Sequence, residues 1–450
     1  MRDLLSKSLI LSSPGLISLI ISLIAIPIHL NEQGFENYGK YIFFHFILSL
    51  GLLINLGIGK MSTIVIGQNI DKLNSIISQN LKYTLIKSSI YFLFYLSVNF
   101  FLNLNHDFLI FFIGLTLTSI YFSFEGIFLG EKKFMKISIL NLLFFSLSLN
   151  VPSLMLFYQS YSVENLILFS IIIKLFTITL MIIEYLKNMN LSINKNNILE
   201  EKILQNYKWI SMNLLNIQIS NFIDKYLVKI FLGLDLLSKY SIPQQLSGKL
   251  SIFSQGFSAF LLQNLSVKKN QNTNLITSIF LFFYLMPIII FLAFPLFNKF
   301  LIFWLDNNYE FEIFNLFKIF VIYAVFSSTS HLVTSKFEAN FKIKNNFKIE
   351  LICLIPFAIL IFIATKNNFS LLNISIIMLI KEVLLLSLRL RFFRRELRSI
   401  QKKYFYNLFL IIIILYSSFF NYVIFYSIIL IIYLPFLINE FYKLYSSKNF

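Results

Sequence analysis

The chain is dominated by runs of roughly 18 to 28 mostly apolar residues, separated by short polar stretches. An α-helix rises about 1.5 Å per residue, so runs of this length match the roughly 30 Å of hydrocarbon in a bilayer. Apolar residues make up 57% of the sequence and charged residues only 13%, whereas soluble domains contain about 25% charged residues. We therefore expect an all-α polytopic membrane protein.

A scan for such runs predicts about fourteen transmembrane helices. The last two share one long apolar stretch, in which Ser417, Ser418 and Asn421 mark the turn. The predicted spans are residues 9–30, 41–59, 84–104, 108–129, 137–158, 163–186, 209–232, 240–266, 275–304, 313–335, 349–365, 370–390, 405–420 and 422–439.

The basic residues alternate between the loops on the two sides of these spans. Of the 38 Lys and Arg residues, 27 fall on the side of the N-terminus, and three, Lys40, Lys239 and Lys366, fall on the other. Because short cytoplasmic loops collect Lys and Arg, we expect a bacterial inner-membrane protein with both termini in the cytoplasm. The net charge of +17 then serves topology and contacts with anionic membrane lipids, not nucleic-acid binding.

Twelve of the spans divide into two sets of six. The end of the first span reads acid, two residues, small residue, Lys, Tyr at positions 36–41, and the end of the seventh repeats this pattern at 235–240. Two halves with the same orientation are typical of transporters built from parallel repeats. We expect an N-terminal six-helix lobe (1–187), a cytoplasmic linker (188–207), a C-terminal six-helix lobe (208–392), and a basic loop with a helical hairpin (393–450).

Four lysines lie near the middle of predicted spans, where a charge costs about 2.5 to 3.5 kcal/mol. They are Lys174, Lys225, Lys249 and Lys381. Lysines at this depth need anionic partners, either an anionic cargo in a polar lumen or acidic side chains in buried ion pairs that hold helices together. The sequence leaves both readings open.

Helical spacing groups several polar residues with these lysines. Gln218, Asn221, Lys225 and Lys229 follow i, i+3, i+4 spacing and share one helix face, which we expect to line the lumen. Gln245 lies one turn before Lys249 on the next span and extends the predicted substrate-binding set. The deep acids Asp224 and Glu382 are ion-coupling candidates, because burial raises the pKa of a carboxyl group.

The motifs of catalysis are missing from the sequence. The run 57–60 has the letters of a phosphate-binding loop, but Ile54 replaces the first glycine and Met61 the required Ser or Thr. The four histidines are far apart, without metal-ligand spacing, and no loop is long enough to form an extramembrane domain. We therefore expect a transporter, not an enzyme, with no cofactor and no metal.

The sequence resembles the Wzx-type O-antigen and polysaccharide-unit flippases. These belong to the superfamily of multidrug, oligosaccharidyl-lipid and polysaccharide exporters (MOP). The resemblance covers the first twelve spans and is carried by residues 35–41 with 55–59, by residues 125–130 before a basic loop, and by residues 221–226 continuing through 232–241.

This resemblance implies two six-helix lobes in a V around a cationic central cavity, with a C-terminal helix pair. The implied cargo is a polyprenyl-diphosphate-linked oligosaccharide, moved from the cytoplasmic to the periplasmic leaflet for surface polysaccharide synthesis. A polysaccharide polymerase and a chain-length regulator are the implied protein partners. Two alternatives remain: an ion-coupled small-molecule antiporter of the same superfamily, and a membrane-embedded polysaccharide polymerase or ligase.

Overall fold

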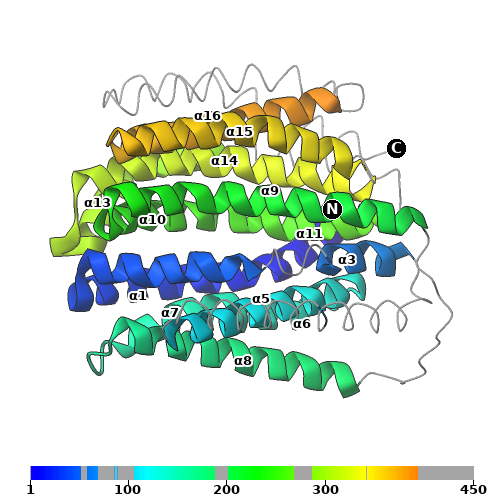
Figure 1. The fold of residues 1–450 in the computed structure, drawn as a ribbon, viewed down its shortest axis with the longest axis horizontal. Coiled ribbons are helices and arrows are strands. Elements are labelled where there is room, and N and C mark those ends of the chain that lie inside the picture. Colours follow the sequence, from blue (N-terminus) through cyan, green and yellow to red (C-terminus); the bar gives the residue numbers. More distant parts are fainter. Residues whose placement is uncertain are drawn as a thin grey trace, which may run out of the picture.

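The computed structural model describes residues 2–51, 58–68, 86, 89, 106–187, 201–267, 286–340 and 342–393. Within these ranges the chain is helical and has no strand. The helices run side by side along the long axis of the molecule (Figure 1). Seven of them, starting at Ser6, Ile110, Phe134, Val163, Phe311, Ile343 and Leu371, are long and apolar enough to cross a membrane.

We call the described helices up to residue 187 the N-terminal half and those from residue 201 onwards the C-terminal half. The N-terminal half contains α1 (Arg2–Ser49), α3 (Ile58–Gln68), α5 (His106–Gly130), α6 (Phe134–Asn141), the π-helix η2 (Leu142–Leu147), α7 (Ser148–Met155) and α8 (Val163–Lys187). The C-terminal half contains α9 (Glu201–Leu232), α10 (Leu234–Gly248), the 3-10 turn η3 (Lys249–Ser251), α11 (Ile252–Val267), α13 (Met286–Leu305), η5 (Asp306–Asn308), α14 (Phe311–Ala339), α15 (Ile343–Lys366) and α16 (Leu371–Phe392).

Eleven of the fourteen predicted spans overlap these helices. Most of the predicted span 84–104, the hairpin 405–439 and most of the linker 188–207 lie outside the described residues, so the predicted number of fourteen stays a prediction.

The first two predicted spans meet at a break within α1. Helix α1 continues through residues 31–40 and is interrupted at Gly34 alone, whose backbone has φ 75° and ψ 177°. This conformation is essentially restricted to glycine, because a Cβ atom would clash with the backbone. A single glycine thus reverses the chain between the first two predicted spans.

The C-terminal half repeats this turn. Gly233, between α9 and α10, has φ 95° and ψ 175°. It lies 199 residues after Gly34 (233 minus 34), and the two copies of the sequence repeat begin two residues after each glycine, at Glu36 and Asp235. The repeat therefore marks equivalent turns at one end of the helical bundle, which we call the Gly34 end. The opposite end is called the Lys60 end.

Helix α1 contacts α10 and α11, and helix α3 contacts α11, across the boundary between the halves. At the Gly34 end, a Cβ atom on Gly39 would stand 2.2 Å from the carbonyl oxygen of Leu234. At the Lys60 end, a Cβ atom on Gly256 would stand 2.2 Å from Oγ of Ser12. Small residues let helix backbones approach this closely in a membrane. The halves consequently touch at both ends.

Candidate functional site

A cavity of about 530 Å³ lies between the halves, enclosed by α1, α5, α6, α7, η2, α10 and α11. Its polar lining includes Ser18, Glu125 and Asn141 from the N-terminal half and Gln245 and Lys249 from the C-terminal half. A second cavity of about 220 Å³ adjoins it towards the Lys60 end, because both are lined by Phe122, Glu125, Leu129 and Ala259. The site thus has two adjoining chambers, which we call the larger and the smaller cavity.

Lys249 reaches the larger cavity because the helix geometry changes at its position. Helix α10 ends at Gly248, and Lys249 begins the 3-10 turn η3. No atom lies within 4 Å of the position that a Cβ on Gly248 would take, so the space beside the lysine is open. The ammonium group donates a hydrogen bond to Ser18 Oγ at 2.6 Å in the other half. Lys249 is therefore a cation that both halves share.

Gln245 lies one turn before Lys249 and has an unused donor. Its Oε1 accepts a long hydrogen bond of 3.5 Å from the hydroxyl of Tyr38 in α1. Its Nε2 is buried without a hydrogen-bond partner among the described residues. A buried amide without a partner is costly, so this donor is suited to a bound molecule.

The predicted lysine face of α9 meets aromatic rings rather than an open lumen. Lys225 Nζ lies 4.7 Å from the centre of the Phe46 ring, and Lys229 Nζ lies 3.9 Å from that of Phe43, both in α1. Lys225 also donates to the carbonyl of Asn221 at 2.6 Å. These cation–π contacts join α9 to the N-terminal half.

The other residues of this predicted set do not line either described cavity. Asn221 is exposed and Gln218 is half-buried on α9. Lys174 is buried inside the N-terminal half, where its amine lies 4.0 Å from the centre of the Phe144 ring and 3.3 Å from the carbonyl oxygen of Phe144. Phe144 belongs to the π-helix η2, in which the regular hydrogen-bond ladder is interrupted.

The predicted ion-coupling acids lie inside the C-terminal half. Asp224 is fully buried and accepts hydrogen bonds from Tyr240 at 3.0 Å, from Lys225 at 3.5 Å and from Gln244 at 3.5 Å. Lys381 donates to the Ser220 hydroxyl. Glu382 is also buried, on the same helix as Lys381. These contacts fit the alternative reading of buried polar groups that hold helices together.

Sequence reasoning did not assign Lys60, Glu125 and Glu338 to the site. Lys60 and Glu125 lie near span ends, where charges are ordinary. The glycines next to two of them, Gly59 and Gly126, are the sequence feature that could have indicated their positions. A Cβ on Gly126 would stand 1.9 Å from the carbonyl oxygen of Gly59, so α3 and α5 touch there. This contact brings Lys60 and Glu125, the neighbours of the two glycines, to one cavity wall.

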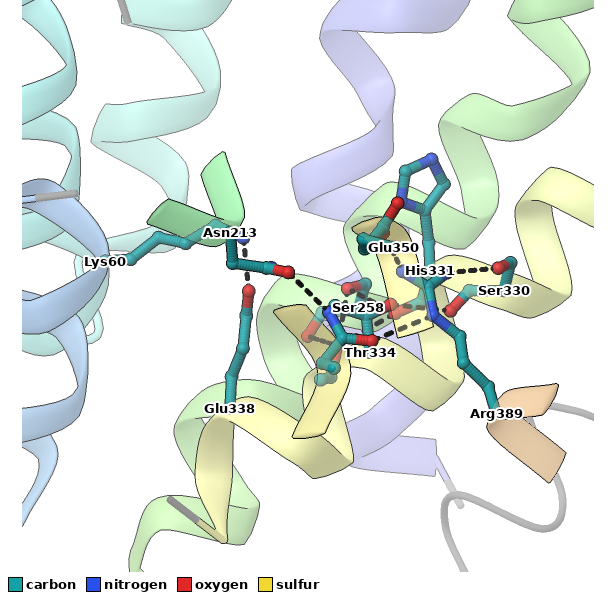
Figure 2. Close-up of polar contacts among 11 residues, drawn as sticks. Lys60, Asn213, Ser258, Ser330, His331, Thr334, Glu338, Glu350 and Arg389 are labelled. Atoms are coloured by element: carbon teal, nitrogen blue, oxygen red, sulfur yellow. Dashed lines mark hydrogen bonds and ion pairs between the residues drawn. The ribbon is translucent and has the colours of Figure 1, made fainter. Parts of the chain in front are cut away.

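Figure 2 shows the polar network at the Lys60 end. Lys60 extends from α3 towards Glu338 of α14, with an Nζ to Oε1 distance of 2.5 Å. Beside it, the buried Arg389 of α16 pairs with Glu350 of α15 and donates to Asn346 at 2.9 Å. Asn346 donates in turn to Asn213 of α9 at 2.9 Å, and Arg389 also donates to Ser330 of α14. Four helices of the C-terminal half therefore share this network.

The fold is that of a MATE transporter. An outward-facing multidrug resistance MATE family transporter of the MOP superfamily superposes with a TM-score of 0.64 at 12% identity, over 88% of this chain and 96% of the other. A mutant of the Vibrio cholerae MATE transporter VcmN gives 0.62 at 13% identity, over 89% and 99%. A MATE protein in the bent conformation gives 0.61 at 13% identity, over 89% and 97%.

No protein-family model and no curated protein sequence matches the chain. These structural neighbours are membrane transporters and not enzymes. The MATE proteins belong to the superfamily of the Wzx-type flippases, and the likeness at this identity concerns the fold.

Proposed function

We propose that this chain is an alternating-access transporter that binds its cargo in the larger cavity. The observation that carries the proposal is a cavity of about 530 Å³ between the halves, with Lys249 on one side and Glu125 on the other. This volume lies within the range of about 300 to 1,000 Å³ that is typical of small-molecule sites. A cavity bounded by both halves changes shape when they move relative to each other, as alternating access requires.

The first candidate function is ion-coupled antiport of a small amphipathic molecule. Its support is the MATE fold together with the mixed charge of the lining, since Lys60 and Lys249 are balanced by Glu125 and Glu338. Such a lining offers carboxylates as well as ammonium groups to a cargo. Glu125 is the group in the larger cavity that offers a negative charge to a cationic cargo or a coupling ion.

The second candidate function is translocation of a polyprenyl-diphosphate-linked oligosaccharide. Its support is the resemblance to Wzx-type flippases, together with the ammonium of Lys249 and the free amide donor of Gln245 in the larger cavity. Both groups suit the oxygens of a phosphate. In this case the inner membrane is the proposed location, both termini are proposed to be cytoplasmic, and the polymerase and chain-length regulator are proposed partners.

Two assays with the same plasmids separate these functions. In a strain without its own oligosaccharide flippase, restored surface polysaccharide would establish the second function. In a strain without its major drug exporters, lower accumulation of a fluorescent organic cation would establish the first. If neither readout changes although the protein is present in the membrane, both candidate functions are wrong.

Lys249→Ala tests the cavity itself in whichever assay responds. We expect at least about a tenfold loss of transport, because a charge-assisted hydrogen bond to the cargo is removed. The matched control is Lys366→Ala, which removes an exposed lysine at the end of α15. Equal activity of both variants would exclude the larger cavity as the cargo site.

A further inference from the structure

The ion pair between Lys60 and Glu338 connects the two halves at the Lys60 end. Lys60 belongs to α3 in the N-terminal half and Glu338 to α14 in the C-terminal half, and their charged atoms are 2.5 Å apart. The two partners differ in burial, since 6% of the Glu338 side chain is exposed and 35% of the Lys60 side chain. A buried carboxylate depends on a nearby cation, whereas a long, partly exposed lysine can reach other partners.

Glu338 lies in a part of the C-terminal half that buried polar contacts hold together. Arg389 and Glu350 form a buried ion pair there that joins α16 to α15, and Arg389 also donates to Ser330 on α14. These contacts hold α14 to its neighbours, so Glu338 moves with the C-terminal half. Separation of the halves at this end must therefore break its contact with Lys60.

A second carboxylate is available to Lys60 within its own half. Glu125 of α5 lines the same smaller cavity as Lys60 and Glu338. The contact of α3 with α5 at Gly59 and Gly126 keeps Lys60 and Glu125 together however the halves move. In this structure Glu125 has a long contact of 3.5 Å with Asn141 Nδ2, which leaves it able to accept a stronger donor.

We infer that Lys60 is a switch that exchanges carboxylates during transport. It pairs with Glu338 of the other half while the Lys60 end is closed, and with Glu125 of its own half when that end opens. The exchange keeps Lys60 paired in both states, so its positive charge has a carboxylate partner when the Lys60 end opens as well as when it is closed. This inference rests on the alternating access proposed above.

The position of Glu125 couples this switch to the larger cavity. Because Glu125 lines both cavities, a cation bound in the larger cavity competes with Lys60 for its carboxylate. When a cation occupies the larger cavity, Lys60 therefore stays paired with Glu338, and closure of the Lys60 end is favoured. The cation that competes at this site can be the cargo or a coupling ion.

Distances between spin labels across the Lys60 end test the switch in the purified full-length protein. Cys353 is the only cysteine and is buried, so a Cys353→Ala background allows labels at Met135→Cys on α6 and Lys348→Cys on α15, which are exposed positions in the two halves. We expect Glu125→Gln to shift the distances towards the closed population and Glu338→Gln towards the open one. Each shift should be about tenfold in the population ratio, as expected for the loss of one charge-assisted hydrogen bond.

Two further variants make the outcome decisive. The double variant Lys60→Glu with Glu338→Lys exchanges the two charges. Two acids, at positions 60 and 125, then lie on the N-terminal half, and the lysine introduced at position 338 of the C-terminal half can pair only with them. The closed population should therefore dominate. Glu164→Gln is the control, because Glu164 pairs with Lys40 inside one half, 2.7 Å away. Shifts in the same direction for the two glutamine variants, or shifts no larger than the control, overturn the switch.

The spin-label readout needs no cargo and is therefore independent of which cargo is proposed. Opposite shifts without any transport in the two cellular assays would uphold the switch and reject the cargo proposals. Transport without opposite shifts would uphold a cargo proposal and reject the switch. Size-exclusion chromatography of each variant shows that it is folded before its distances are compared.

Discussion

The buried pair of Arg389 and Glu350 permits a quantitative prediction about the stability of the C-terminal half. Arg389 is 3% exposed and Glu350 4%, and the arginine also donates to Asn346 and Ser330. Replacing Arg389 by Met leaves the Glu350 carboxylate buried without its cation, which costs about 3 to 5 kcal/mol of unfolding free energy. Replacing both residues by Met removes the stranded charge and leaves only neutral groups unsatisfied, at about 1 to 3 kcal/mol.

The measurement can use the single native cysteine. Cys353 lies on α15, one turn after Glu350, and is buried. A thiol-reactive dye therefore reports unfolding of this region in detergent as temperature or denaturant rises. We expect Arg389→Met to be less stable than the double variant Arg389→Met with Glu350→Met.

An exposed ion pair provides the control for this experiment. Lys136 and Glu184 pair in the N-terminal half, with 49% and 33% of their side chains exposed. Lys136→Met should therefore cost no more than about 1 kcal/mol. If the double variant is as unstable as Arg389→Met, the stranded carboxylate is not the cause and the reasoning is refuted.

Three further predictions concern the contacts between and within the halves. Gly39→Leu should shift spin-label distances at the Gly34 end towards an open population, because its Cβ would overlap the carbonyl of Leu234; unchanged distances would contradict the close approach. Gly256→Leu, whose Cβ would overlap Ser12, should open the Lys60 end instead, and a shift at the Gly34 end would count against this. Lys174→Met should retain transport, since Lys174 contacts the Phe144 ring inside the N-terminal half. Loss of transport in a stably folded variant would indicate that Lys174 does belong to the cargo site.

Much of the fold could be predicted from local sequence. The apolar runs fix which segments cross a bilayer, because the length of a helix and the thickness of the membrane are independent of how the helices pack. The repeat at 36–41 and 235–240 also had a structural meaning, because both copies follow a glycine with positive φ. The sequence did not show that each turn is made at the preceding glycine, Gly34 or Gly233.

The candidate site was predicted less completely. Lys249 and Gln245 line the larger cavity, but Lys174, Lys225 and Lys381 lie against rings, carbonyls or hydroxyls elsewhere. A lysine in the middle of a span must find a partner, and the sequence does not say whether that partner is cargo, an aromatic ring or another helix. This is why depth alone could not separate the cavity lysine from the others.

Composition and local pattern were sufficient to predict a helical membrane protein and the positions of most of its described helices, because these depend on the transfer of each segment from water to lipid. The assembly of the site depends on contacts between residues far apart in the chain. Lys60 meets Glu338 across 278 positions, and Lys249 meets Ser18 across 231. Such pairs arise when glycines such as Gly59, Gly126 and Gly256 let particular helices approach, and this selection is a property of packing in three dimensions.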